Sequence, residues 1–187
     1  MQLDQLESHH DLLARWNQKL NLIRVPDLKE LVQLHYCESL FLATLLPKGS
    51  IRVADVGSGA GFPGIPVAVF RPECRVDLIE SDQRKGVFLR EATRSIPNAL
   101  VIGERAESLK PGSYDWLVTR AVSPAAVLDL RLAPDFMLLG SLGRANSTAG
   151  VEWREPIKVP WGRSRYVLAG SLHVPRGTPD VLRSTST

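Results

Sequence analysis

The sequence predicts an α/β protein in which a mostly parallel sheet carries helices on both faces and follows a helical N-terminal extension. From residue 51 onward, short apolar runs of strand type alternate with helical patterns roughly every 20 to 25 residues. A turn with four glycines, DVGSGAGFPGIP at residues 55–66, joins the first of these strands to a helix. Glycine is costly to order, so such a turn implies a tight bend or a close approach to the backbone.

The elements follow one another in a regular order. Leucines at helical spacing make residues 3–46 helical, with a break in NLIRVPD at Pro26. Val87, Phe88 and Ala92 are expected on one face of the helix that follows the second strand. The predicted strands are 51–56, 75–80, 98–103, 114–122 and 136–142, with one or two more near 164–174. The predicted helical segments between them are 64–71, 81–95, a short helix or turn at 104–109, and 123–136 with a proline break.

The same patterns suggest a division of the chain into three parts. We expect an N-terminal helical extension at residues 1–48 and a Rossmann-like domain at residues 49–178. Residues 179–187, which read VLRSTST at their end, are expected to fray.

The composition says more about the cellular compartment of the protein than about its chemical function. The 187 residues carry a net charge of +3 with an isoelectric point near 9.1, which favours an anionic partner or reflects only a basic surface. Two cysteines without metal-ligand spacing suit a reducing cytoplasm, and His9, His10 and His35 form no metal triad. We find no membrane-spanning run and no signal-peptide pattern, and we expect a cytoplasmic monomer without metal.

Polar groups follow each of the first four predicted strands. These groups are Asp55 with the glycine turn, Glu80-Ser81-Asp82, Arg105-Ala106-Glu107 and Thr119-Arg120-Ala121. Ligands of open α/β sheets bind beyond the carboxyl ends of the strands, so these residues are candidate ligand contacts. The alternative is that the acids and serines only cap helices, a role that Ser81, Asp82 and Ser123 could fill.

The spacing of these groups indicates the kind of ligand. Glu80 lies at the end of the second strand, where a carboxylate can accept both hydroxyls of a ribose. Asp55 beside the glycines disfavours a pyrophosphate and favours an ammonium group. Pro63 and Pro66 lack N–H groups, so the following helix offers few donors to a phosphate. A nucleoside bearing a positively charged amino acid, S-adenosylmethionine, fits better than a dinucleotide.

The stretch VADVGSGAGFPGIPVAVFRPE, with RWNQKLNLIRVPD and HYCESL before it and YDWLVTRA after it, resembles the ribosomal RNA small subunit methyltransferase G family, also called glucose-inhibited division protein B. The resemblance runs from about Leu12 to Ala121. It implies a class I S-adenosylmethionine-dependent methyltransferase of the bacterial cytoplasm that acts on guanine N7 in 16S rRNA. It places cofactor contacts on Gly57, Phe62, Glu80, Ser81, Asp82, Ala106, Glu107 and Arg120, with Asp55 and Gly59 on the same motif.

The sequence also departs from the family pattern. Its N-terminal helical part is shorter by about a helix, and residues 143–160 look shortened. Glu38 stands where the family usually has aspartate, and Gly140-Ser141 follow FMLL where a Lys-Gly pair is common.

The residues fit attack by guanine N7, whose lone pair needs no general base. No cysteine has the setting of a pyrimidine-methylating nucleophile, and Arg120 could hold the cofactor carboxylate or orient guanine O6. Two alternatives stay open: a methyltransferase of the same fold acting on a protein or small molecule, and a cofactor-binding module with weak or no catalysis. Trp16 is either an RNA-facing platform or a core residue. Candidate RNA contacts are Arg15, Lys19, Arg24, His35, Arg84, Lys85, Arg90, Arg163, Arg165 and Arg176.

Overall fold

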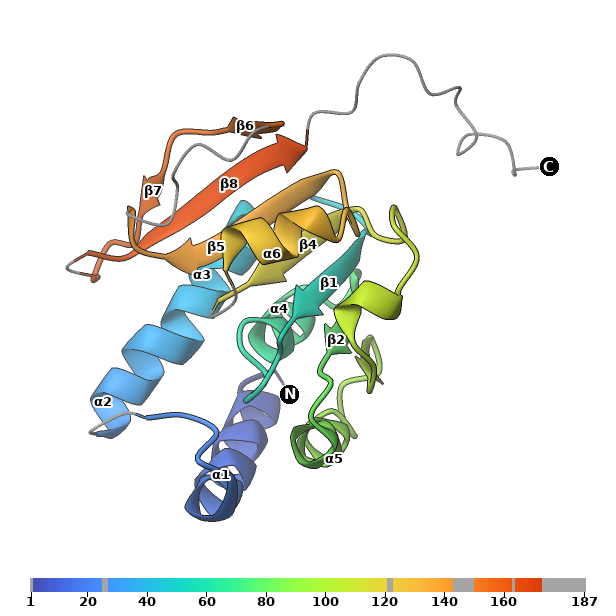
Figure 1. Ribbon diagram of the computed structural model, residues 1–187. Helices are drawn as coiled ribbons and strands as arrows, with labels where there is room; N and C mark the ends of the chain where they lie inside the picture. Colours follow the sequence, from blue (N-terminus) through green and yellow to red (C-terminus); the bar gives the residue numbers. More distant parts are fainter. Residues whose placement is uncertain (1, 25–26, 121–122, 143–149, 163, 173–187) are drawn as a thin grey trace.

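Figure 1 shows the computed structural model, which describes residues 2–24, 27–120, 123–142, 150–162 and 164–172. The N-terminal part is helical, as predicted. Helix α1 spans Gln2–Leu20, and α2 (Leu28–Leu31), the π-helix η1 (Val32–Cys37) and α3 (Glu38–Leu45) follow one another without interruption. Asp27 caps α2, because its side chain accepts a hydrogen bond from the Glu30 amide at 2.8 Å. The predicted break at Pro26 lies outside the described residues.

Five parallel strands form the centre of the sheet in the order β3-β2-β1-β4-β5. They are β1 (Arg52–Val56), β2 (Arg75–Ile79), β3 (Ala99–Ile102), β4 (Trp116–Thr119) and β5 (Asp135–Gly140). The long strand β8 (Tyr166–Leu172) pairs antiparallel with β5, and β6 (Val151–Trp153) and β7 (Ile157–Lys158) pair antiparallel with β8. The mostly parallel α/β architecture is therefore confirmed.

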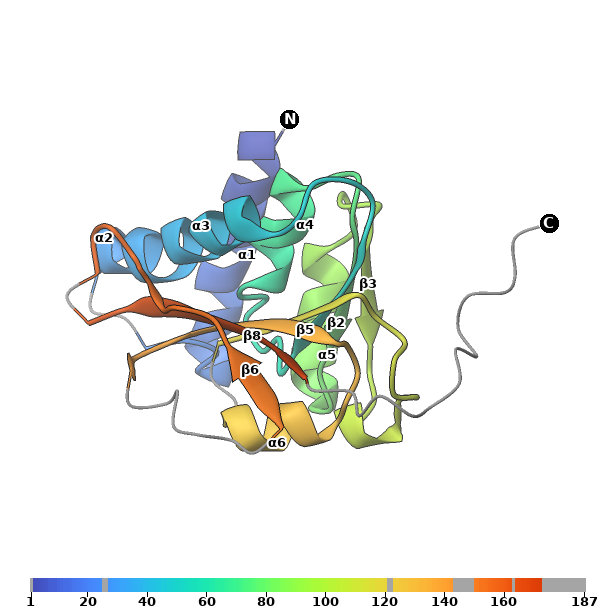
Figure 2. The same ribbon diagram turned by 90° about the horizontal axis from the view of Figure 1, so that it is seen from above.

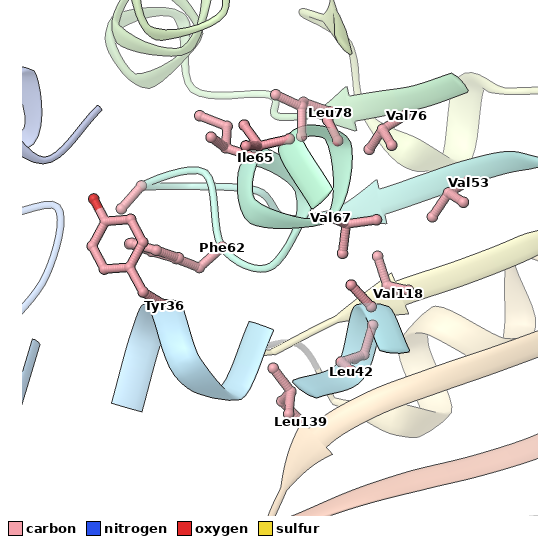
Figure 3. Close-up of a cluster of buried hydrophobic side chains, with 14 of the residues drawn as sticks. Tyr36, Leu42, Val53, Phe62, Ile65, Val67, Val76, Leu78, Val118 and Leu139 are labelled. Atoms are coloured by element: carbon pink, nitrogen blue, oxygen red, sulfur yellow. The ribbon is translucent and has the colours of Figure 1, made fainter. Parts of the chain in front are cut away.

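Helices cover both faces of this sheet, with α3 and α4 on one side and α6 on the other (Figure 2). The first face carries a large apolar cluster from α1, α3, α4 (Gly64–Phe70) and α5 (Gln83–Ala92). Figure 3 shows part of it, where Val67 of α4 and Leu42 of α3 meet the strand residue Val118. The second face packs against α6 (Pro124–Asp129) and the residues around the 3-10 helix η2 (Ala106–Ser108). Helix α1 thus shares its core with the sheet.

Two local expectations differ from the structure. Val87 is 50% exposed, because α5 packs through Phe88, Leu89 and Ala92 and turns Val87 away from the core. Strands β6 and β7 were not predicted, because they are only three and two residues long, too short for an alternating pattern to stand out.

Candidate functional site

The carboxyl ends of β3, β2, β1 and β4 lie next to one another at one edge of the sheet. The parallel register aligns Val56 with Ile79 and Ile79 with Ile102, so the residues after these strands reach the same edge. Thr119 ties β4 to β1 by donating from Oγ1 to the Val56 carbonyl at 2.7 Å. The strand order reverses between β1 and β4, which is where ligands bind in open α/β sheets.

Several backbone amides of the glycine turn after β1 donate hydrogen bonds to carbonyls of the protein itself. Gly57, Gly59 and Gly61 all have positive φ, at 73°, 53° and 88°. The amides of Gly57 and Ser58 donate to the Ile79 carbonyl at 3.0 and 3.2 Å, and the Gly61 amide donates to the Ser58 carbonyl at 2.7 Å. These donors are used inside the protein, so the turn is not built to cradle a phosphate. A Cβ at Gly59 would meet only the Gly57 oxygen, at 3.8 Å, so the turn borders open space there.

Glu80 holds the position predicted for a ribose-binding carboxylate. Its Oε2 accepts a hydrogen bond from the Gly59 amide at 3.0 Å, and its Oε1 accepts one from the Asp82 amide at 2.9 Å. A carboxylate has about four acceptor positions, so these two bonds orient Glu80 and leave capacity for a diol.

The other predicted contacts on this side differ in what they do. Asp82 caps α5, with Oδ1 accepting the Lys85 and Arg84 amides at 3.1 and 2.9 Å, and these bonds lower the pKa of its carboxyl. The capping interpretation therefore accounts for Asp82. Ser81 and Glu107 are exposed, and Ala106 is half-buried at the start of η2.

Asp55, near the end of β1, is the strongest candidate for a ligand contact beside the glycine turn. Its side chain is fully buried; Oδ2 accepts from the Gly64 amide at 3.0 Å, while Oδ1 is buried without a hydrogen-bond partner. Burial raises the pKa of Asp55 to about 7, and the nearby charge of Glu80 adds to this. A Cβ at Gly64 would lie 2.5 Å from Oδ2, which explains a glycine there. An unpartnered buried acceptor suits a ligand with a cationic donor.

The start of α4 confirms that few amides are available to a phosphate. The Gly64 amide is bound by Asp55, the Ile65 amide donates to the Gly61 carbonyl at 2.8 Å, and Pro66 has no N–H. Two carboxylates with acceptor capacity therefore dominate this edge of the sheet. This pair of acceptors fits the ammonium and ribose hydroxyls of S-adenosylmethionine, which donate.

Phe62 lies among aromatic side chains from the N-terminal helices. Its ring centroid is 4.9 Å from that of Tyr36, 4.9 Å from that of His35 and 5.2 Å from that of His9. His9 in turn bonds the Ala60 carbonyl through Nε2 at 2.9 Å and the Tyr36 hydroxyl through Nδ1 at 2.8 Å. Burial lowers the pKa of His9 to about 4, so this imidazole is neutral. The Phe62 ring therefore anchors the turn to α1 and η1, and Figure 3 shows it beside Tyr36.

Arg120, the predicted orienting residue, belongs to an ion-pair network that the sequence did not reveal. Glu38 is completely buried and binds Arg165 through Nε at 3.0 Å and Nη2 at 2.8 Å. Arg120 Nη1 lies 3.4 Å from Glu38 Oε2 and also donates to the Leu34 carbonyl. Burial lowers the pKa of Arg120 to about 10, so it remains charged at neutral pH. HYCESL contains Glu38, but its partner Arg165 lies 127 residues later.

Several candidate RNA contacts need revision. His35 is not a cation, because burial and the charges of Arg120 and Arg165 lower its pKa to about 3. Trp16 packs against Phe88 and donates from its indole nitrogen to Glu91 at 3.2 Å, which favours the core interpretation. A shallow pocket of about 160 Å³ lies beside it and is lined by Leu12, Arg15, Trp16, Lys19 and Glu91. Arg163 and Arg176 lie outside the described residues.

No group of three or more His, Cys, Asp or Glu side chains in the part of the chain that the structure describes is placed to hold a metal ion. None of the described helices is both long and apolar enough to cross a membrane.

The fold and the strand-end site together define a Rossmann-like protein of the S-adenosylmethionine-dependent methyltransferase class. Among solved structures, a SAM-dependent methyltransferase from Aquifex aeolicus is similar with a TM-score of 0.61 at 16% identity, covering 76% of this chain and 93% of that one. The 23S rRNA methyltransferase ErmE gives a TM-score of 0.55 at 16% identity, covering 80% of this chain and 70% of that one. At such identities these likenesses concern the fold.

The sequence comparisons identify the family. Residues 2–134 match GidB, the rRNA small subunit methyltransferase G family, and the chain belongs to this family. Ribosomal RNA small subunit methyltransferase G of Xanthomonas euvesicatoria pv. vesicatoria (strain 85-10) is 43% identical over 118 residues, which are 62% of this chain and 55% of the relative. The protein of that name from Paracoccus denitrificans (strain Pd 1222) is 33% identical over 165 residues, 83% of this chain and 86% of the relative. The chain thus spans about half the length of the Xanthomonas relative, and the resemblance noted in the sequence is confirmed.

Proposed function

We propose that this protein binds S-adenosylmethionine at the ends of β1 to β4 and transfers its methyl group to N7 of a guanine in 16S rRNA of the small ribosomal subunit. The observation that carries the cofactor assignment is the pair of carboxylates, Asp55 with its unpartnered Oδ1 and Glu80 held by two amides. The name of the family supports the RNA substrate. Action on ribosomal subunits would place the protein in the cytoplasm of a bacterium, where we expect it to work as a monomer.

The residues supply positions and charges rather than a base. Asp55 would accept the cofactor ammonium and remain ionised beside it, since an adjacent positive charge lowers the pKa of a carboxyl. Glu80 would accept the ribose hydroxyls, and Gly59 leaves the space for close approach of the ligand. S-adenosylmethionine supplies the electrophilic methyl group. Guanine N7 already carries an exposed lone pair, so proximity and alignment suffice.

The proposed RNA contacts lie on the N-terminal helices and on α5. Arg15 and Lys19 line the shallow pocket on α1, while Arg84 and Lys85 stand in the first turn of α5, directly after Asp82. Several such contacts would make binding fall steeply with salt, because each neutralised phosphate releases counterions. A methyltransferase acting on a protein or small molecule would show no such salt dependence.

The decisive experiment measures methyl transfer from labelled cofactor to 30S subunits and to 16S rRNA. We expect transfer to guanine-containing RNA and none to RNA with 7-deazaguanine at the modified position, although both should bind. Methylation of the 7-deaza substrate would place the chemistry on another atom. Tight binding of the cofactor without transfer to any ribosomal substrate would instead favour the binding module.

Glu80→Ala separates the cofactor site from the RNA site. The variant should bind S-adenosylmethionine more weakly by about 1–3 kcal/mol, the cost of losing a hydrogen bond to a charged group. Its affinity for RNA should not change. Equal cofactor affinity of the wild type and the variant by calorimetry would refute the assignment of Glu80.

A further inference from the structure

The π-helix η1 holds His35 rigidly against the glycine turn. Three successive carbonyls around it accept side-chain donors: Gln33 from the Trp161 indole at 3.2 Å, Leu34 from Arg120, and His35 from the Ser39 hydroxyl at 2.5 Å. A π-helix is uncommon and often marks a functional position. Two of these donors come from distant segments, Arg120 directly after β4 and Trp161 before β8. Ser39 bonds within the continuous helical run, so the backbone that carries His35 is held both locally and from outside.

The His35 ring has one buried and one outward edge. It packs on Phe62 with centroids 4.9 Å apart at an angle of 43°. Its Nδ1 is buried without a hydrogen-bond partner, whereas the residue as a whole is partly exposed. The other ring nitrogen, Nε2, therefore lies on the exposed edge of a ring that stands beside the turn and Arg120.

The surroundings also fix where the ring carries its proton. Burial, with the positive charges of Arg120 and Arg165, lowers the pKa of His35 to about 3, and Glu38 is the acid that faces both arginines. The ring is neutral and carries a single N–H. An N–H at the buried Nδ1 would lose its hydration without gaining a hydrogen bond, which is unfavourable. A lone pair on Nδ1 is instead favoured by the two guanidinium groups nearby. The proton therefore belongs on Nε2.

We propose that His35 contacts the RNA substrate directly, donating a hydrogen bond from Nε2 to O6 of the target guanine and so selecting guanine over adenine. This rests on the proposed function. Guanine presents N7 and O6 as neighbouring acceptors, whereas adenine has an amino donor in place of O6. A donor beside the reacting N7 therefore accepts guanine and opposes adenine. A neutral donor also withdraws less electron density from N7 than a cation would, and it keeps the lone pair nucleophilic.

Arg120 supports this arrangement. Its guanidinium is engaged by Glu38 and by the Leu34 carbonyl, one residue before His35. It thereby positions the backbone of His35.

A matched pair of variants distinguishes the two ring nitrogens. His35→Gln places an amide nitrogen near Nε2, and His35→Asn places one near the buried Nδ1; His35→Phe keeps the packing on Phe62 and removes both nitrogens. On RNA with guanine at the target, kcat/KM should fall about tenfold in the Asn and Phe variants, the scale of one neutral hydrogen bond. His35→Gln should stay within about threefold of the wild type.

The second arm removes the partner atom from the RNA. 2-Aminopurine retains N7 and lacks O6, so with this base at the target the wild type should fall to the level of His35→Phe, and His35→Phe should fall no further. In competition binding without cofactor, the wild type and His35→Gln should prefer guanine RNA, and His35→Phe should not. Thermal melting and the affinity for S-adenosylmethionine should stay close to the wild type in His35→Gln and His35→Phe, whereas His35→Asn should melt lower because its amide donor takes the buried position that has no acceptor.

Equal impairment of the Gln and Phe variants, or an undiminished effect of His35→Phe on the 2-aminopurine RNA, would overturn the role of His35 while leaving the methyltransferase function intact. No transfer by the wild type to guanine RNA would overturn the function itself, and the role of His35 with it.

Discussion

Replacing Glu38 with glutamine should destabilise the protein strongly. Glu38 is completely buried and binds Arg165 through both carboxylate oxygens, with Arg120 3.4 Å from Oε2. Glutamine keeps the shape but leaves two guanidinium groups facing each other without a counter-charge. Breaking a buried ion pair costs about 3–5 kcal/mol, and we expect the lower end, about 3 kcal/mol, because both arginines can regain some water. Their side chains are 16% and 29% exposed.

Urea unfolding followed by circular dichroism measures this loss directly. For a chain of this size, about 3 kcal/mol corresponds to a fall in Tm of about 6–12 °C. Glu73→Gln is the matched control, because it removes the same charge from an ion pair with Arg71 in which Glu73 is 42% exposed. A loss in Glu38→Gln no larger than that in Glu73→Gln would refute the reasoning. So would additivity with Arg165→Met, since residues in one network should couple.

Three further predictions concern the strand-end site and the RNA. Gly59→Ala should weaken S-adenosylmethionine binding at least tenfold, because its Cβ would enter the open space that the ligand needs beside the turn. The positive φ should also cost the variant about 1 kcal/mol of stability. Gly49→Ala, which has a positive φ and open space as well, is the control in calorimetry. The pKa of Asp55 rises from its ordinary value of 3.8 to about 7 in the folded state, so the folded state binds the proton more tightly and stability should fall between about pH 4 and pH 7. Cofactor affinity should rise over about pH 6 to 8 as the carboxyl ionises, and Asp55→Asn should abolish both trends. The affinity for 16S rRNA should fall steeply with salt, and less steeply in a variant lacking Arg84 and Lys85; identical slopes would remove α5 from the interface.

The parts of the fold that are encoded locally could be predicted from the sequence. The apolar run before DVGSGAGFPGIP, the glycines and the acid at the next strand end all act within one βαβ unit, so their pattern indicated β1, α4 and the position of Glu80. The antiparallel edge was harder to predict, because β6 and β7 are only three and two residues long.

The rest depends on contacts between distant segments. The residues around Glu38 do not indicate that Arg165 is its partner, because the two are 127 residues apart. HYCESL also contains no pattern that distinguishes a π-helix from an α-helix. The shifted pKa values of His35 and Asp55 could not be predicted from the sequence either, because they result from burial and from charges that come together only in the folded chain.

The pairing of Glu38 with Arg165 has a consequence for synthesis of the chain. Arg165 leaves the ribosome 127 residues after Glu38, a delay of roughly 10 s at ordinary translation rates. During that interval α3 cannot bury Glu38 with its full complement of counter-charge, even after the parallel strands β1 to β5 have been made. Arg165 directly precedes the antiparallel strand β8, so synthesis of this late segment supplies the cation that completes the ion-pair network of Glu38. A nascent chain that stopped before Arg165 would contain every residue of the glycine turn and still lack the cation that binds both carboxylate oxygens of Glu38.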